Sequence, residues 1–349
     1  MRLLSQYLPL VINILTSYQL AISQTNREKL VINTIDTADT LPADFICRLD
    51  DLQILKVSGE ERIKYLQGQV TADMTSLSSN EGLLGCHCDF KGKAWNIFYA
   101  LEHDESVLFV SHKEGAAKST PELKKYGVFA KVEFSDDTTS WACFGGQGAQ
   151  LEAVITQLFA DVPAKDRQTL SNENGVVMAL GSPQMRFMLV LTEQGQAALA
   201  AHDELQYAPG TLWEVQDIKA GIAQLRTATS NEFVPQMMNL QAVNAISFSK
   251  GCYMGQEVVA RTKFLGKNKR AAFVLKAEEA VDLEAGATLE IPVGDNWRRG
   301  GTVLRCATLG TETWLLAVVA NDTEVGTNMR LKDQPNKVFT VQSLPYSLE

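Results

Sequence analysis

The segment Lys250-Gly251-Cys252-Tyr253-Met254-Gly255-Gln256-Glu257 places a thiol between a lysine and a tyrosine, with a glycine on each side. A nearby cation stabilises a thiolate, so Cys252 can be a nucleophile or a soft metal ligand. Gly251 and Gly255 allow the backbone to adopt positive φ or to approach a ligand closely. A glycine-containing turn with a half-buried cysteine is the structural alternative. The pattern therefore marks a candidate site centred on Cys252.

Composition indicates a globular protein rather than one that coats nucleic acid. The 349 residues can bury a large core in two or three domains, and the net charge is −9. A local basic patch remains compatible with that charge. Six cysteines spread over this length indicate no disulfide framework. Only Cys86-His87-Cys88 is clustered, which is too little for a tetrahedral zinc site, so we expect a plain strand there and no metal.

Residues 1–24 differ in composition from the remaining chain. An apolar run there faintly resembles a signal peptide, with Ala21 and Ser23 as small residues. Polar residues interrupt the run, and it is far shorter than a membrane span requires. We therefore predict a separate N-terminal extension over residues 1–24 and no membrane partner. The pattern of free thiols favours the cytoplasm.

The order of helix and strand patterns indicates an α+β fold with antiparallel sheets, since no glycine-rich nucleotide fingerprint occurs. A capping box at residues 58–61 predicts one helix start, and Thr120-Pro121 predicts another. Residues 128–134 have a strand pattern. From about Arg270, short β runs separated by turn residues indicate a small barrel. The Cys252 segment then lies at a domain junction, a usual place for a ligand cleft.

The same segment, continued to Arg261, resembles the signature of the YgfZ family, which are folate-binding proteins related to the glycine-cleavage T-protein. Further family-like segments follow one order along the chain: residues 65–73, 87–93, 233–236, 239–242, 263–270, 296–299 and 344–348. The resemblance extends from about residue 45 to the C-terminus.

This resemblance implies a T-protein-like folate-binding domain over residues 25–262 and a C-terminal β-barrel domain over residues 263–349. It implies an accessory protein that binds tetrahydrofolate or a derivative and supports iron–sulfur enzymes. Through those enzymes it would support the thiolation of some tRNAs, with Cys252 as the functional thiol. The other residues of the motif loop that are expected to belong to this site are Lys250, Gly251, Tyr253, Gly255, Gln256 and Glu257.

Trp213 lies in a helical pattern over residues 211–218, about a third of a turn from its apolar stripe. It can therefore point into a cleft, where an indole can stack on a pterin, or complete the core as a rim tryptophan. The resemblance places the family's folate-binding tryptophan here, so we expect folate between Trp213 and the motif loop. A second family aromatic corresponds to Leu52, which cannot stack in the same way.

Aminomethyl transfer by T-proteins depends on an acidic pair that follows a Gly-Gly turn. The matching segment here is Lys91-Gly92-Lys93-Ala94-Trp95-Asn96, in which neither acid is present. The missing acids therefore favour a relative of the T-protein that is not an enzyme. The alternative is a folate-dependent one-carbon transferase. Asp89, Lys91 and Lys93 can form a charged hairpin turn or contact a ligand.

Cations gather after the motif at Arg261, Lys263, Lys267, Lys269 and Arg270. They can hold the glutamyl tail of folate or an RNA phosphate, or they can be a solvated linker. Direct contact with tRNA is therefore left open. A ligand-free RNA or protein scaffold is the remaining alternative, and it predicts salt-sensitive tRNA binding.

Overall fold

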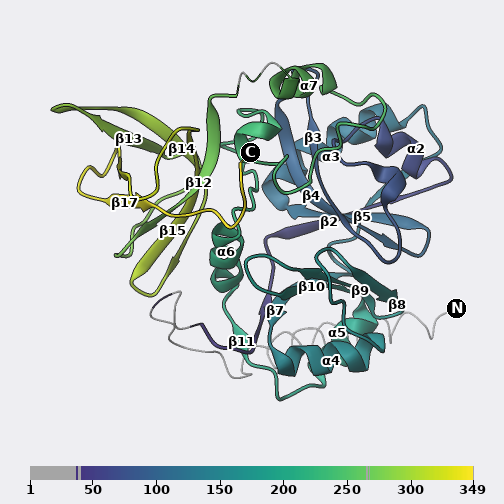
Figure 1. Cartoon of the computed structure of the whole chain (residues 1–349). Coiled ribbons are helices and arrows are strands. Elements are labelled where there is room, and N and C mark those ends of the chain that lie inside the picture. The colour runs from purple at the N-terminus through teal and green to yellow at the C-terminus, as the bar shows by residue number, and fades with distance from the viewer. Residues whose placement is uncertain (1–36, 38–40, 265, 267, 349) are drawn as a thin grey trace, which may run out of the picture.

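The computed structural model describes residue 37 and residues 41–264, 266 and 268–348. The N-terminal extension expected over residues 1–24 lies outside these residues. The described chain forms two sheets with helices packed on them, followed by a barrel (Figure 1). The predicted α+β class and the predicted C-terminal barrel are confirmed. Among the described residues, no helix is both long and apolar enough to traverse a lipid bilayer.

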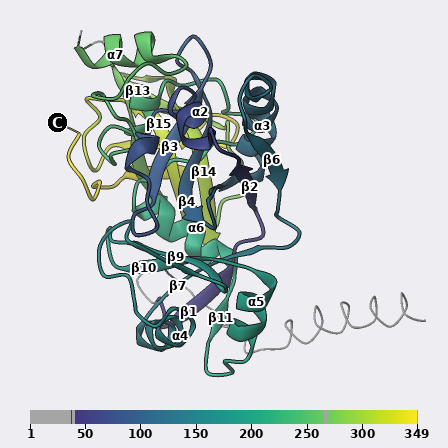
Figure 2. The same ribbon diagram turned by 90° about the vertical axis from the view of Figure 1, so that its right-hand side faces the viewer.

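The first sheet is antiparallel and has the strand order β3-β4-β5-β2-β6. Its strands are β2 (Leu52–Ser58), β3 (Leu83–Cys88), β4 (Ala94–His103), β5 (Ser106–His112) and β6 (Glu133–Asp136). Helices α2 (Arg62–Gln67) and α3 (Lys113–Gly127) and the short helix η1 (Met74–Ser76) belong to this domain, and α3 runs alongside the sheet (Figure 2). Cys86, His87 and Cys88 lie in β3, which confirms the plain strand predicted for them.

The second sheet has the order β11-β1-β7-β10-β9-β8. Its strands are β1 (Phe45–Arg48), β7 (Ala142–Gln147), β8 (Thr169–Asn172), β9 (Gly175–Leu180), β10 (Arg186–Leu191) and β11 (Tyr207–Ala208), accompanied by helices α4 (Ala149–Phe159) and α5 (Glu193–Ala200). Side chains alternate along β10: Leu189 packs in the core beneath α4, whereas Met188 packs in the central core. The sheet therefore separates two cores.

The barrel closes in the order β12-β15-β14-β13-β16-β17. Its strands are β12 (Arg270–Ala277), β13 (Thr288–Val293), β14 (Asn296–Leu309), β15 (Glu312–Ala320), β16 (Asn328–Leu331) and β17 (Val338–Val341). Helix α6 (Gly210–Lys219) lies between the barrel and the second sheet and contacts β14, β15 and β1 (Figure 1). The short helix η2 (Pro235–Met238) and α7 (Gln256–Phe264) connect the sheets to the barrel.

Two predicted helix starts are wrong. Helix α3 begins at Lys113 instead of Thr120, because His112 at the end of β5 caps it by accepting a hydrogen bond from the backbone N–H of Glu114. Pro121 lies inside this helix on an exposed side. Helix α2 begins at Arg62 without any side-chain cap, so no capping box forms.

The strand predicted over residues 128–134 begins only at Glu133. Residues 127–130 form a turn instead, in which the backbone N–H of Ala130 donates to the carbonyl of Gly127. A hairpin turn, one of the two alternatives considered for Asp89, is present in the structure. The Asp89 carboxylate accepts the backbone N–H groups of Lys91 and Lys93 at 2.9 and 2.8 Å, closing the turn between β3 and β4.

Candidate functional site

A cavity of about 390 Å³ lies where the two sheets, α6 and the barrel meet. It is lined by Arg48, Leu49, Asp50, Asp51, Leu52, His112, Gly210, Thr211, Trp213, Glu214, Asp217, Gln224, Arg226, Arg305, Cys306 and Ala307. We call it the central cavity. Its size falls in the range of small-molecule sites, and its walls combine a few apolar side chains with seven charged ones, which is more charge than such sites usually carry.

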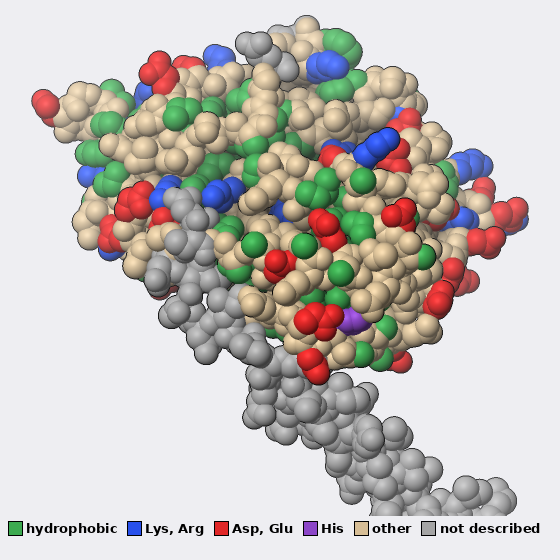
Figure 3. Space-filling model, turned by 60° about the horizontal axis from the view of Figure 1, so that its bottom comes forward, with side chains coloured by type: hydrophobic (Ala, Val, Ile, Leu, Met, Phe, Trp, Pro, Cys, Tyr) green, Lys and Arg blue, Asp and Glu red, His purple; other side chains and the backbone are tan. Residues whose placement is uncertain are grey.

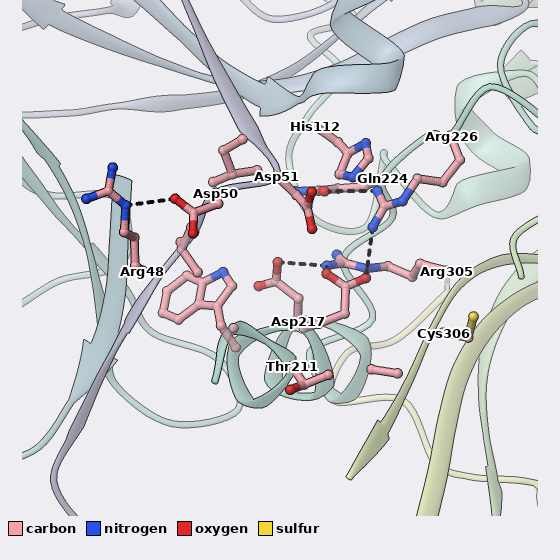
Figure 4. Close-up of a pocket in the computed structure, with 16 residues that line it drawn as sticks. Arg48, Asp50, Asp51, His112, Thr211, Asp217, Gln224, Arg226, Arg305 and Cys306 are labelled. Carbon is pink, nitrogen blue, oxygen red and sulfur yellow. Dashed lines mark hydrogen bonds and ion pairs between the residues drawn. The ribbon is translucent and has the colours of Figure 1, made fainter. Parts of the chain in front are cut away.

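Ion pairs between α6 and three separate parts of the chain hold one wall of the central cavity together. Figure 4 shows the pairs with Arg226 and Arg305. Asp217 lies 2.6 Å from Arg186 Nη1 of β10 and 3.2 Å from Arg305 Nη2 of β14. Glu214 accepts from Arg305 Nε at 2.7 Å and pairs with Arg226 at 3.1 Å. Because both acids lie on one face of α6, a single helix connects the second sheet to the barrel.

Burial alone raises the pKa of the Glu214 carboxyl, but the neighbouring cations, Arg305 above all and also Arg226, together hold that pKa below its ordinary value. Glu214 is therefore ionised at neutral pH. His112, by contrast, is uncharged at neutral pH, because burial lowers the pKa of its imidazole to about 4. A buried ionised acid beside a neutral imidazole offers hydrogen-bond acceptors to a polar ligand.

Trp213 forms part of the cavity wall and is 5% exposed. Its six-membered ring lies so close to Gly145 of β7 that a Cβ there would be 2.3 Å from a ring carbon. The Arg186 guanidinium lies 4.4 Å from the ring centroid. The indole therefore lines the cavity, and most of its surface packs in the central core, so both alternatives drawn from the sequence apply in part.

The loop between β1 and β2 forms the opposite wall. Asp51 pairs with Lys113 Nζ at 2.5 Å, and this hydrogen bond holds the pKa of the Asp51 carboxyl below its ordinary value. Leu52 lines the same cavity, half-buried. The two positions at which the family resemblance implies folate contact, Trp213 and Leu52, are therefore brought together.

The motif loop is anchored to the first domain by Lys250. Its ammonium is buried and donates to the backbone carbonyls of Val70 and Ala72, at 2.8 and 2.5 Å. Burial lowers the pKa of Lys250 to about 8. Tyr253 is buried as well, and burial raises its pKa. These contacts make Lys250 and Tyr253 the structural anchors of the loop.

Cys252 is exposed at the end of this anchored loop. The described part of the chain contains all six cysteines, and the other five are buried or half-buried. Gly255 has φ +81°, and a Cβ there would lie 2.5 Å from the carbonyl oxygen of Asp89, so glycine is required. Gln256 donates weakly to the carbonyl of Gly251 at 3.4 Å.

Some of the charged residues after the motif form ion pairs or contact aromatic rings, and others are exposed. Glu257 forms an exposed ion pair with Arg261 at 2.5 Å within α7. The Lys263 ammonium lies 3.8 Å from the ring centroid of Phe248. Lys269 and Arg270 are exposed at the start of the barrel, and Lys267 lies outside the described residues. The basic cluster is therefore a surface around the C-terminal end of α7.

The structure does not bring the motif loop to Trp213. None of the residues from Lys250 to Glu257 lines the central cavity, and α7 and α6 lie in different parts of Figure 1. The ionic residues of the cavity were not predicted from the sequence. The available signal was Glu214 and Asp217, two acids three residues apart in a helix with an apolar stripe. Asn96, at the position of the missing acids, is buried and donates to Ser111 Oγ at 2.9 Å.

Two packed sheets followed by a barrel, with a polar cavity at their junction, define the class of aminomethyltransferase-like folds. Aminomethyltransferase T of the glycine cleavage system from Bartonella henselae has this fold, with a TM-score of 0.69 over 88% of this chain and 87% of that one, at 15% identity. The YgfZ β-barrel domain family matches residues 268–334. The chain belongs to the YgfZ family.

Two relatives establish that membership. The tRNA-modifying protein YgfZ of Yersinia enterocolitica is 39% identical over 315 residues, which is 89% of this chain and 95% of the relative. The protein of the same name from Pectobacterium atrosepticum is 37% identical over 314 residues, or 89% and 94%. The similarity therefore extends over about nine-tenths of this chain.

Proposed function

We propose that this protein binds tetrahydrofolate or a derivative in the central cavity and supports iron–sulfur enzymes that thiolate some tRNAs. The observation that carries the folate part is the meeting of Trp213 and Leu52 in one cavity of ligand size. The names of the relatives support the connection to tRNA modification. The free cysteines support a cytoplasmic setting, where thiols stay reduced.

The residues of the central cavity suit a flat heterocycle that carries N–H groups. Leu49, Leu52 and Trp213 supply apolar surface that excludes water, and Asp51 and Glu214 supply ionised carboxylates that accept hydrogen bonds. A pterin combines a flat ring with N–H donors on one edge. The carboxylates would hold that edge, and the apolar wall would hold the ring.

Cys252 acts in this proposal as the functional thiol. It is exposed on a loop that Lys250 fixes in place, which suits a thiol that must meet a partner. Because the loop does not line the central cavity, the thiol faces an iron–sulfur enzyme or its RNA instead of the bound folate. Folate would then act on the protein's conformation or on the partner, without contact to Cys252.

Titration of the protein's fluorescence with tetrahydrofolate tests the ligand. We expect saturable quenching that disappears in Trp213→Phe and persists in Trp297→Phe, whose tryptophan lies on the β13–β14 hairpin. Phenylalanine is preferred to alanine because truncating a buried tryptophan costs about 3–5 kcal/mol of stability. No saturable change in the native protein would reject folate binding and favour the ligand-free scaffold.

Complementation tests the thiol. In cells that lack this protein, tRNA thiolation is measured after supplying the native chain, Cys252→Ser or Cys143→Ser. Cys143 is the matched control, since it does not line the central cavity and burial raises the pKa of its thiol to about 12. We expect Cys252→Ser to fail and Cys143→Ser to restore thiolation. Full thiolation with Cys252→Ser would eliminate the proposed thiol role.

A further inference from the structure

A second cavity, of about 610 Å³, lies where α7 meets the barrel. Its walls come from the segment around η2, from the C-terminal end of α7 and from the start of β12. We call it the junction cleft and define it by Gln236, Gln241, Phe248, Lys263 and Arg270. None of the residues discussed for the central cavity belongs to it.

The junction cleft is basic in a protein that is acidic. Among the described residues that line it, Lys263 and Arg270 carry charge and no Asp or Glu occurs. The whole chain carries a net charge of −9, and acidic side chains are scattered over the face with α4 and α5 (Figure 3). A cleft that gathers cations without acids attracts an anionic ligand selectively.

Two aromatic rings lie beside Lys263. The Lys263 ammonium is 3.8 Å from the ring centroid of Phe248 and 5.8 Å from that of Phe264. Phe264 is the last residue of α7 and is 72% exposed, whereas phenylalanine side chains are mostly buried. Cations interleaved with exposed aromatic rings are the usual means of binding single-stranded nucleic acid, through phosphates and stacked bases.

The polar wall of the junction cleft has unused acceptors. Gln236 is 4% exposed and donates its Nε2 to the carbonyl of Val259 at 2.6 Å, while its Oε1 has no hydrogen-bond partner among the described residues. Gln241 Oε1 is also buried there without a partner in the described chain. Amide oxygens of this kind accept hydrogen bonds from the amino and imino groups of nucleobases.

The chain connects the junction cleft directly to Cys252. Phe248 lies four residues before Cys252, and Thr262 and Lys263 return to the cleft after it. Four residues span at most about 14 Å, so the exposed thiol lies within that distance of the cleft along the backbone. An RNA in the junction cleft would therefore lie near the thiol.

We infer that the junction cleft binds a single-stranded segment of RNA, with a base near Phe248 and Phe264 and phosphates at Lys263 and Arg270. This inference rests on the proposed role in tRNA modification and specifies a direct contact with the RNA. Folate would occupy the central cavity and RNA the junction cleft. The two ligands would therefore contact different residues.

Fluorescence anisotropy of the full chain with a labelled 12-nucleotide single-stranded RNA tests the inference, with the same sequence as a duplex for comparison. The variants are Lys263→Gln/Arg270→Gln and Phe264→Ser, and the control Lys64→Gln/Lys124→Gln removes equal charge from exposed sites elsewhere. Each variant is first checked by thermal unfolding, and each is also titrated with tetrahydrofolate.

We expect the native protein and the control to bind the single strand more tightly than the duplex. In Lys263→Gln/Arg270→Gln, the slope of log affinity against log salt should fall by about 1.4, or about 0.7 for each lost phosphate contact. Phe264→Ser should weaken single-strand binding about fivefold or more with the slope unchanged. Tetrahydrofolate binding should be the same in all of these proteins.

Three results would overturn the inference: no RNA binding by the native protein, equal RNA affinity of Lys263→Gln/Arg270→Gln and the control, or loss of folate binding alone in that variant. The last would assign the cleft to the glutamyl tail of folate. If the native protein binds tetrahydrofolate but does not bind RNA, only this inference is rejected. If the native protein binds RNA at the junction cleft but does not bind tetrahydrofolate, only the proposed folate role is rejected.

Discussion

Arg305 of barrel strand β14 pairs with Glu214 of helix α6, with Arg305 Nε 2.7 Å from Glu214 Oε1 and Arg305 Nη2 in contact with Glu214 Oε2. The same guanidinium donates to the carbonyl of Ile222 at 2.8 Å and contacts Asp217. Arg305 is completely buried. A single barrel side chain therefore satisfies two acids and a carbonyl in the wall of the central cavity, which couples the barrel to the ligand site.

Arg305→Met should destabilise the protein by about 3–5 kcal/mol, because it leaves two buried carboxylates with fewer cationic partners. The free energy of unfolding in urea measures this loss. Lys64→Met is the control, since Lys64 pairs with Glu61 on the surface and such pairs contribute about 0–1 kcal/mol. A loss of less than 1 kcal/mol in Arg305→Met would contradict the coupling role.

Glu214 should make the protein sensitive to acid. Its folded-state pKa lies below the ordinary value of 4.5, so its ionised form contributes stability above that pH and loses it as the pH falls through the folded-state value. We expect Glu214→Gln to lose less stability than the native protein between pH 5 and pH 3. The measurement is the difference in unfolding free energy between the two proteins at each pH. A difference that stays constant with pH would refute the assignment.

The barrel and most strands were predictable because each short strand carries its own alternation and its own turn residues. Helix starts were less predictable. Thr120-Pro121 has the local pattern of a first turn, but β5 runs directly into α3 at His112, and Pro121 is accommodated on the exposed side. The tertiary connection overrode the local signal.

The candidate site was only partly predictable. Trp213 and Leu52 could be associated through the family resemblance. The spacing of Glu214 and Asp217 in one helix was a signal for the acids, whereas nothing in the spacing pointed to their distant partners Arg186, Arg226 and Arg305. Lys250 lies two residues before Cys252 in the sequence, which suggested a cation beside the thiol. Its ammonium instead hydrogen-bonds the carbonyls of Val70 and Ala72, a distant contact that spacing cannot indicate.

Lys250 should give a characteristic dependence of stability on alkaline pH. Burial lowers its folded-state pKa from 10.5 to about 8, so between these values the unfolded chain binds more protons and Lys250 contributes more stability as the pH rises. We compare native protein with Lys250→Met from pH 7 to 9.5, which cancels the titration of tyrosines and cysteines common to both.

The unfolding free energy of the native protein should rise relative to Lys250→Met by up to about 1.4 kcal/mol per pH unit above pH 8. Lys64→Met, which removes an exposed lysine, should show no such dependence. A native protein that loses stability relative to Lys250→Met over this range would show that the Lys250 ammonium is not desolvated.

Leu52→Trp should strengthen folate binding, because it returns an aromatic ring to the wall of the central cavity opposite Trp213. An aromatic contact contributes about 0.5–1.5 kcal/mol beyond area burial, so we expect tetrahydrofolate to bind about twofold to tenfold more tightly. Titration calorimetry gives the Kd, and Leu52→Met is the control that keeps an apolar side chain without a ring. If Leu52→Trp folds normally but binds tetrahydrofolate with the native Kd, the pterin does not lie against this wall of the cavity.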